Sequence, residues 1–134
     1  MEDKICHMFV YGTLKEGRPF DRSFFSNIRL SVQPATVVGD IYHINFFPGI
    51  KLGGKNLAYG EVHEFDRRDM KAVVPVMDAI EGYSPKRDKA DNLFIRKVVK
   101  AKVKGGEELD AYVYEFAGRV DDAQRVNGGV WEPH

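Results

Sequence analysis

One carboxylate lies where the amphipathic pattern of a predicted helix calls for an apolar residue. Between residues 66 and 82, apolar side chains recur at the three-and-four spacing of a helix that packs against a core. The residues of this stripe are Met70, Val73, Val74, Met77 and Ile80. At about 100° per residue, Glu81 falls inside the same stripe. Burying an unpaired charge is costly, so Glu81 needs either a partner or a raised pKa that lets it exchange protons near neutral pH.

The residues that flank this stripe predict where the helix begins and ends. Asp66 is the expected N-terminal cap, and Gly82 is expected to end the helix. Pro75 lies inside the helix, where it removes one backbone donor, and it predicts a kink or a restart. Ile80 and Glu81 both follow Pro75, so their relative phase does not depend on that interruption.

The composition fits one globular domain with a hydrophobic core. We expect a single domain over residues 1–134, with a core over residues 5–116 and a tail over residues 117–134. The formal net charge of zero argues against nucleic acid or a membrane surface as a partner. No apolar run reaches the roughly 18 residues of a membrane span, and the N-terminus lacks a signal-peptide pattern. We therefore expect a cytoplasmic protein.

Most of the remaining chain has the pattern of β-strands. Strands are predicted over residues 5–11, 36–44, 59–65, 94–103 and 109–116. Gly39 lies inside one of them and predicts a bend or a close backbone approach. Residues 45–55 are interpreted as an unusually apolar loop. Many strands with one substantial helix favour an α+β fold, built on a strongly bent mixed sheet or barrel with flanking helices.

The last two predicted strands form a hairpin, since Gly105 and Gly106 between them can supply the positive φ values of a tight turn. If these two glycines alone form the turn, Arg96 lies opposite Glu115. Opposite charges would then meet across the two strands, which supports this register.

Several short motifs occur in a characteristic order. The letters VYGTL occupy residues 10–14, and DAIEGY occupies residues 78–83. Between and after them come GDIY at 39–42, PG at 48–49, GEV at 60–62 and AYVY at 111–114. Over roughly residues 8–116, the chain resembles the gamma-glutamylcyclotransferase-like family, which has YGTL and D-x-x-E-G-Y signatures and includes the gamma-glutamylamine cyclotransferases.

The resemblance implies a compact mixed β-barrel with the YGTL loop beside the glutamate. Relatives act on gamma-glutamyl amines or gamma-glutamyl peptides and release 5-oxoproline and a free amine. They need no metal and no organic cofactor. The resemblance implies that Glu81 is the catalytic acid and base. It also implies that the substrate is bound by Tyr11, Gly12, Thr13, Leu14 and Tyr112.

The chemistry of this reaction agrees with a glutamate of raised pKa. The attacking α-amine must lose a proton, and the leaving nitrogen must gain one, so a single carboxyl group between the two nitrogens can do both. Backbone N–H groups of Gly12, Thr13 and Leu14 could hold the substrate carboxylate and the developing oxyanion. Because the ring closes within one molecule, much of the rate could come from holding the substrate in a folded pose.

Other interpretations of these residues remain open from the sequence. Glu81 could be a helix-end glutamate in an ion pair, and Tyr112 could belong to an aromatic stripe of the core. The chain could also be a non-catalytic module that binds a small ligand or a partner protein, with an exposed apolar loop that contains Phe46, Phe47 and Ile50.

Several further polar residues receive structural interpretations. Asp78 is interpreted as a cap or as a hydrogen-bond partner of residues 11–14, and Arg96 as the cross-strand partner of Glu115. The family usually has a Y-x-R motif at Arg96, but Phe94 replaces its tyrosine here. The four histidines and Cys6 lack the spacing of metal ligands, so no metal site is predicted. The leaving group of the substrate and the oligomeric state do not follow from the sequence.

Overall fold

The computed structural model describes residues 5–11, 25–44, 47–88 and 91–130. Its strands are β1 (His7–Val10), β2 (Arg29–Ile44), β3 (Phe47–Phe65), β4 (Phe94–Val103) and β5 (Glu108–Phe116). Its α-helices are α1 (Phe25–Ile28) and α2 (Met70–Ile80), and its short 3-10 helices are η4 (Asp122–Gln124) and η5 (Asn127–Gly129). Within this part of the chain, no helix is long and apolar enough to cross a membrane.

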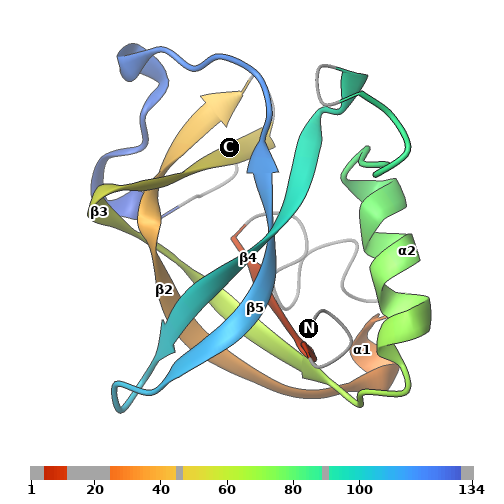
Figure 1. The fold of residues 1–134 in the computed structure, drawn as a ribbon. Coiled ribbons are helices and arrows are strands. Elements are labelled where there is room, and N and C mark those ends of the chain that lie inside the picture. Colours follow the sequence, from red (N-terminus) through yellow and green to blue (C-terminus); the bar gives the residue numbers. More distant parts are fainter. Residues whose placement is uncertain (1–4, 12–24, 45–46, 89–90, 131–134) are drawn as a thin grey trace.

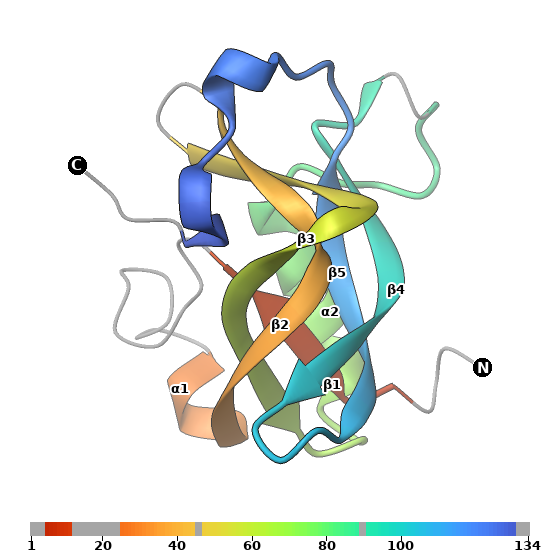
Figure 2. The ribbon, with the colours of Figure 1, turned by 90° about the vertical axis from the view of Figure 1, so that its left-hand side faces the viewer.

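The strands close into a barrel in the order β1-β3-β2-β4-β5, which confirms the α+β barrel expected from the sequence. Neighbouring strands in this order are antiparallel, and a parallel contact between Met8 of β1 and Tyr112 of β5 closes the ring. Helix α2 lies along the side of β4 and β5, while β2 and β3 form the opposite wall (Figures 1 and 2).

Two apolar clusters hold this arrangement together. One fills the barrel and includes Phe9, Ile41 and Val113, each at most 2% exposed. The other lies between the barrel and α2, where Val73 and Met77 of the predicted helix stripe are also at most 1% exposed. Successive residues of β5 point to opposite faces of the strand. Its outward aromatic side chains belong to this second cluster, and its inward side chains belong to the first.

The apolar segment after residue 45 is part of a strand, so its interpretation as an exposed loop is wrong. β3 begins at Phe47, whose ring packs 5.9 Å from the ring of Phe94 and 6.5 Å from that of Phe116. Ile50 is fully buried. Phe46 lies outside the described residues. Because Phe47 and Ile50 contribute to the core, they cannot provide the exposed surface that suggested a binding module.

The long strands β2 and β3 bend sharply, and glycines permit the bend. A register shift separates Val38 from Gly39, and a β-carbon at Gly39 would lie 2.8 Å from the carbonyl oxygen of Lys51, which confirms the close backbone approach expected at that glycine. At Gly60 a β-carbon would lie 2.3 Å from the carbonyl oxygen of Val10, so no larger residue fits between β3 and β1 without displacement.

Helix α2 begins later than predicted and ends where predicted. Its N-cap is Asp69, so the prediction of Asp66 as the cap is wrong. The Asp66 carboxylate instead accepts the backbone N–H of Arg68, at 2.9 Å, in the turn before the helix. The helix is continuous through Pro75, so it does not restart there.

The C-terminus of α2 is a Schellman motif. Gly82 has a φ of +67°, and the N–H groups of Gly82 and Tyr83 donate to the carbonyls of Ala79 and Asp78 at 3.3 and 2.9 Å. Glu81 is the C-cap residue between them. This motif fixes the backbone around Glu81 by local hydrogen bonds, as a glycine directly after the helix predicts.

The β4–β5 hairpin is present, but its register differs by one residue from the predicted one. Lys104 joins the two glycines in the turn, since Val103 donates to the carbonyl of Glu107. Arg96 therefore lies opposite Tyr114, and its predicted pairing with Glu115 is wrong. The partner of Glu115 is Lys97, whose Nζ lies 2.6 Å from its carboxylate.

The tail folds back onto β2. Val126 donates its N–H to the carbonyl of Ile41 at 2.7 Å, and the Gln124 amide donates to the carbonyl of His43 at 3.0 Å. These bonds satisfy backbone groups on an edge of β2, so residues 122–126 act as a short addition to the barrel wall.

Candidate active site

Glu81 is the C-cap residue directly after α2, at the edge of the layer between the helix and the barrel. The residue is half-buried, and burial of its carboxyl raises the pKa of Glu81 from 4.5 to about 7. Desolvation destabilises the charged form of a carboxyl group, which accounts for the direction of this change. At neutral pH, Glu81 is therefore present in both its protonated and its ionised form, as an acid–base residue requires.

Tyr11, directly after β1, reaches the same region from inside the barrel. Its hydroxyl donates to the carbonyl of Tyr114 at 2.8 Å and accepts the N–H of Ile50 at 3.1 Å, so it bridges β5 and β3. Burial raises the pKa of Tyr11, and the negative charge of Glu81 raises it further. The Tyr11 side chain and Glu81 are therefore close enough to interact. Gly12, Thr13 and Leu14 lie outside the described residues.

A hydrogen-bonded network lies one helical turn before Glu81. The carboxylate of Asp78 accepts the hydroxyl of Tyr114 on one oxygen at 2.6 Å and Nη1 of Arg96 on the other at 2.5 Å. Both side chains of the ion pair are 14% exposed. The guanidinium also lies 5.4 Å from the ring centre of Tyr83 and 5.2 Å from that of Tyr112.

This network shows which side chains Asp78 and Arg96 contact. In the described part of the chain, Asp78 ties α2 to β4 and β5, which sequence reasoning did not find. The signal that could have found it is the register: only when Arg96 is opposite Tyr114 do both side chains face the helix. The three-residue spacing puts Asp78 and Glu81 on the same side at the end of α2. Strand alternation puts Arg96 and Tyr114 on the face of the hairpin that lies toward this helix.

Tyr112 is buried at 5% exposure and packs beneath the Arg96 guanidinium. It belongs to the aromatic stripe of β5 together with Tyr114 and Phe116, and all three are core residues. The stripe is thus structural, as one interpretation held. A contact between Tyr112 and a substrate stays a prediction.

A second group of chemically capable side chains lies at the start of β1. Ligand atoms of Cys6, His7 and Glu64 lie within 4.8 Å of one another, although their spacing in the sequence did not predict a cluster. Cys6 Sγ lies 3.8 Å from Nδ1 of His7, whereas Glu64 lies 3.9 Å from Nε2 of the same ring. The fold therefore brings together three side chains of metal-ligating types that the sequence spacing did not group.

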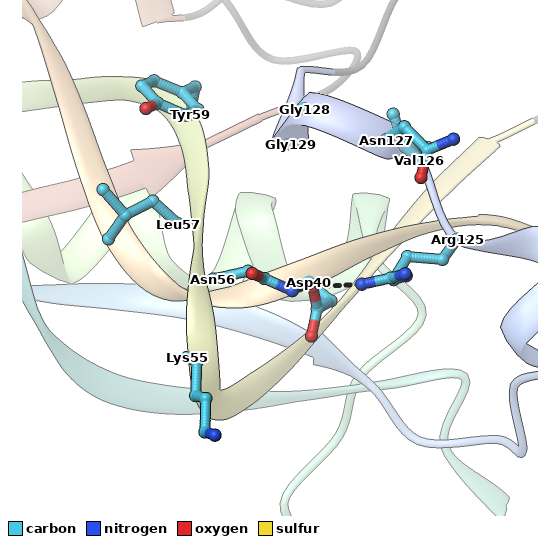
Figure 3. Close-up of a pocket in the computed structure, with 10 residues that line it drawn as sticks. All are labelled: Asp40, Lys55, Asn56, Leu57, Tyr59, Arg125, Val126, Asn127, Gly128 and Gly129. Atoms are coloured by element: carbon cyan, nitrogen blue, oxygen red, sulfur yellow. Dashed lines mark hydrogen bonds and ion pairs between the residues drawn. The ribbon is translucent and has the colours of Figure 1, made fainter.

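A hollow of about 310 Å³ lies on the β2–β3 side of the barrel, against the tail (Figure 3). Asp40 lies at its centre and accepts the amide of Asn56 at 2.9 Å, with Arg125 3.9 Å away. Leu57 and Tyr59, on the same strand as Asn56, also line the hollow, across from residues 126–129 of the tail. Neither Glu81 nor Tyr11 lines this hollow, so it is separate from the candidate acid–base residue.

Comparisons with known proteins agree with the motifs in the sequence. The model of a protein family described as "Gamma-glutamyl cyclotransferase, AIG2-like" matches residues 8–133, so the match includes most of the tail. No curated protein matches the sequence.

Solved structures share the fold at low sequence identity. An AIG2-like protein from Mus musculus is 18% identical with a TM-score of 0.63, over 96% of this chain and 88% of the mouse chain. The uncharacterized protein PH0828 from Pyrococcus horikoshii is 18% identical with a TM-score of 0.57, over 93% and 88% of the two chains. A gamma-glutamyl cyclotransferase is 14% identical with a TM-score of 0.51, over 83% and 66%.

Proposed function

Because this chain belongs to the gamma-glutamyl cyclotransferase, AIG2-like family, we propose that it is a cyclotransferase for a gamma-glutamyl amine or a gamma-glutamyl peptide. The observation that carries this proposal is the carboxyl of Glu81, whose pKa burial raises to about 7, in the D-x-x-E-G-Y motif. The products are 5-oxoproline and a free amine or amino acid.

In the proposed reaction, one carboxyl group moves a proton between two nitrogens of the substrate. The Glu81 carboxylate first takes a proton from the α-ammonium group, and the free amine attacks the γ-carbonyl carbon to form a tetrahedral intermediate. Protonated Glu81 then gives that proton to the leaving nitrogen as the carbon–nitrogen bond breaks. The surplus proton left on the ring nitrogen passes through the Glu81 carboxylate to the released amine, which departs as an ammonium group. Glu81 returns to its ionised form, so the cycle consumes no external acid or base.

Pre-organisation supplies the rest of the catalytic effect in this proposal. The attacking amine and the carbonyl belong to one molecule, so holding the substrate in a ring-like pose removes most of the entropic barrier. Main-chain N–H groups of Gly12, Thr13 and Leu14 are proposed to bind the substrate carboxylate and the oxyanion. Tyr11, which precedes them, is anchored by its hydrogen bonds to Tyr114 and Ile50, and this anchoring supports a fixed start for that segment.

A panel of gamma-glutamyl amines and peptides tests the proposal, with 5-oxoproline measured by mass spectrometry. Glu81→Gln keeps the shape of the side chain but cannot carry the proton, so we expect a loss in kcat of about 10² to 10⁴-fold. Glu107→Gln, in the exposed hairpin turn, is the matched control and should keep full activity. Equal turnover by Glu81→Gln and the wild type would refute the role of Glu81.

The same panel separates the enzyme from a non-catalytic binding module. A module would bind a gamma-glutamyl compound in calorimetry without releasing 5-oxoproline, and Glu81→Gln would scarcely change its affinity. Binding without turnover across the whole panel would therefore overturn the cyclotransferase proposal.

A further inference from the structure

Asp78 precedes Glu81 by three residues and accepts hydrogen bonds from two donors, the Tyr114 hydroxyl and the Arg96 guanidinium. We propose that Asp78 is a positioning residue for Glu81: it keeps the Tyr114 hydroxyl hydrogen and the Arg96 charge away from that carboxyl. This inference rests on the proposed function for its catalytic consequence, but its effect on Glu81 can be measured without turnover.

The direction of the hydrogen bonds is the first argument. A tyrosine hydroxyl has a single hydrogen to donate. Tyr114 gives its hydrogen to Asp78, and Tyr11 gives its hydrogen to the carbonyl of Tyr114. Both hydroxyl hydrogens are therefore already used, and each oxygen can only accept a further bond. A neutral Glu81 carboxyl could donate to such an oxygen, whereas an ionised one would meet lone pairs.

The electrostatics around these hydroxyls agree with that direction. Burial raises the pKa of both Tyr11 and Tyr114, and the negative charge of Glu81 raises each further. Both phenols thus lie within the field of the Glu81 carboxyl and remain neutral. For Tyr114, the hydrogen bond to Asp78 also raises the pKa, so Asp78 holds the hydroxyl in its donating form.

The position of Arg96 is the second argument. Burial alone would lower the pKa of Arg96, but its hydrogen bond to Asp78 and the charge of Asp78 raise it, so the guanidinium stays charged. It lies between the rings of Tyr83 and Tyr112, on the β4 side of Asp78. The carboxylate of Asp78 neutralises this cation at 2.5 Å. Without that carboxylate, an uncompensated cation in a partly buried site would stabilise ionised Glu81.

The described groups that surround this pair come from each neighbouring element. Helix α2 contributes Asp78, the turn directly after it contributes Glu81 and Tyr83, and β4 contributes Arg96. β5 contributes Tyr112, Tyr114 and Glu115, and Tyr11 follows β1. The charge of Glu115 is countered by Lys97 at 2.6 Å. Among these groups, Arg96 is the cation next to the network, so Asp78 is the residue that decides its effect.

The variant Asp78→Asn tests the inference because it keeps the size of the side chain and removes its charge. The probe is the carboxyl carbon of Glu81, followed by NMR in protein labelled with ¹³C glutamate and assigned with Glu81→Gln. In the wild type we expect a midpoint near pH 7. In Asp78→Asn we expect this midpoint to fall by about one pH unit or more. The low-pH limb of the kcat/KM profile should move by the same amount.

A double variant distinguishes positioning from a general loss of structure. Adding Arg96→Met to Asp78→Asn removes the uncompensated cation, so the Glu81 midpoint should return toward pH 7. A merely structural role would not be rescued in this way. Asp110→Asn is the matched control, because Asp110 also pairs with a cation, Lys100 at 2.7 Å, but both are exposed. The control should leave the midpoint unchanged.

Tyr114→Phe provides a second test in which the ion pair of Asp78 and Arg96 is intact. Since the Tyr114 hydrogen is not given to Glu81, its removal should not raise the Glu81 midpoint. A marked rise would show that Tyr114 donates to Glu81 and would overturn the inference. An unchanged midpoint in Asp78→Asn would also overturn it. Failure of the cyclotransferase proposal would instead appear as absence of 5-oxoproline, with the NMR midpoints unaffected.

Discussion

Replacing Glu81 by glutamine separates the energetic cost of a buried carboxylate from its role in chemistry. Burial raises the pKa of Glu81 from 4.5 to about 7, so the folded protein holds a proton on this residue over a pH range in which the unfolded chain does not. A carboxyl whose folded pKa is raised contributes stability that is complete below pH 4.5 and is lost as the pH rises through 7. Glu81→Gln is neutral at every pH, so its stability should not show this fall as the pH rises.

The size of the effect follows from the two pKa values. A pKa of about 7 in place of 4.5 corresponds to about 3 kcal/mol at high pH, since each tenfold change in proton affinity corresponds to about 1.4 kcal/mol. Part of this contribution to the free energy of unfolding is already lost at pH 5. The contribution of Glu81 therefore falls by about 2 to 3 kcal/mol between pH 5 and pH 8.5. The stability of Glu81→Gln relative to the wild type should increase by that amount.

Urea unfolding followed by far-UV circular dichroism at both pH values measures this difference. All other groups titrate alike in the two proteins, so they cancel in the comparison. Glu107→Gln is the control, because it makes the same chemical change at an exposed turn residue and should give no pH-dependent difference. If the relative stability of Glu81→Gln is the same at pH 5 and pH 8.5, the Glu81 carboxyl is ionised at little cost, and the reasoning about its burial is refuted.

Two further substitutions test the scaffold around the site. Tyr11→Phe leaves the buried N–H of Ile50 and the carbonyl of Tyr114 without their hydroxyl partner, so we expect a loss of about 1–3 kcal/mol in urea unfolding; an unchanged midpoint would mean that the hydroxyl is not needed to join β3 and β5. Gly82→Ala places a β-carbon at a φ of +67°, with Leu93 at 3.7 Å as its close neighbour, so we expect a backbone cost of about 1–2 kcal/mol; a neutral or stabilised variant would contradict the Schellman ending of α2.

Periodicity and one glycine were enough to predict the buried face of the helix and its acidic end. The apolar spacing from Met70 to Ile80 predicted which face of α2 is buried, and Gly82 predicted where the helix stops. Both signals are local, because they depend on the turn of the helix and on the φ value of one residue. The start of the helix was predicted too early, since Asp66 caps a preceding turn by the same kind of side-chain hydrogen bond.

The strand from Phe47 was missed for the opposite reason. Proline and glycine residues between 48 and 54 are typical of a loop, yet this segment pairs with β2 through most of its length. Pairing with a partner strand and burial of Phe47 and Ile50 outweigh the weak local preference of those residues. A bent strand with glycines at its bends cannot be told from an apolar loop without knowledge of its partner.

The network beside Glu81 shows why a single catalytic candidate was visible in the sequence while its surroundings were not. Opposite charges were available in either hairpin register, Arg96 with Glu115 in one and Lys97 with Glu115 in the other, so charge pairing could not decide between them. The length of the turn decided it, and with it the face to which Arg96 points. Once Arg96 faces α2, it must find a counter-charge in a partly buried layer, and Asp78 is the carboxylate placed there by the helix. The pairing of Asp78 with Arg96 thus follows from the same turn geometry that leaves Glu81 as the carboxyl whose pKa is raised by burial.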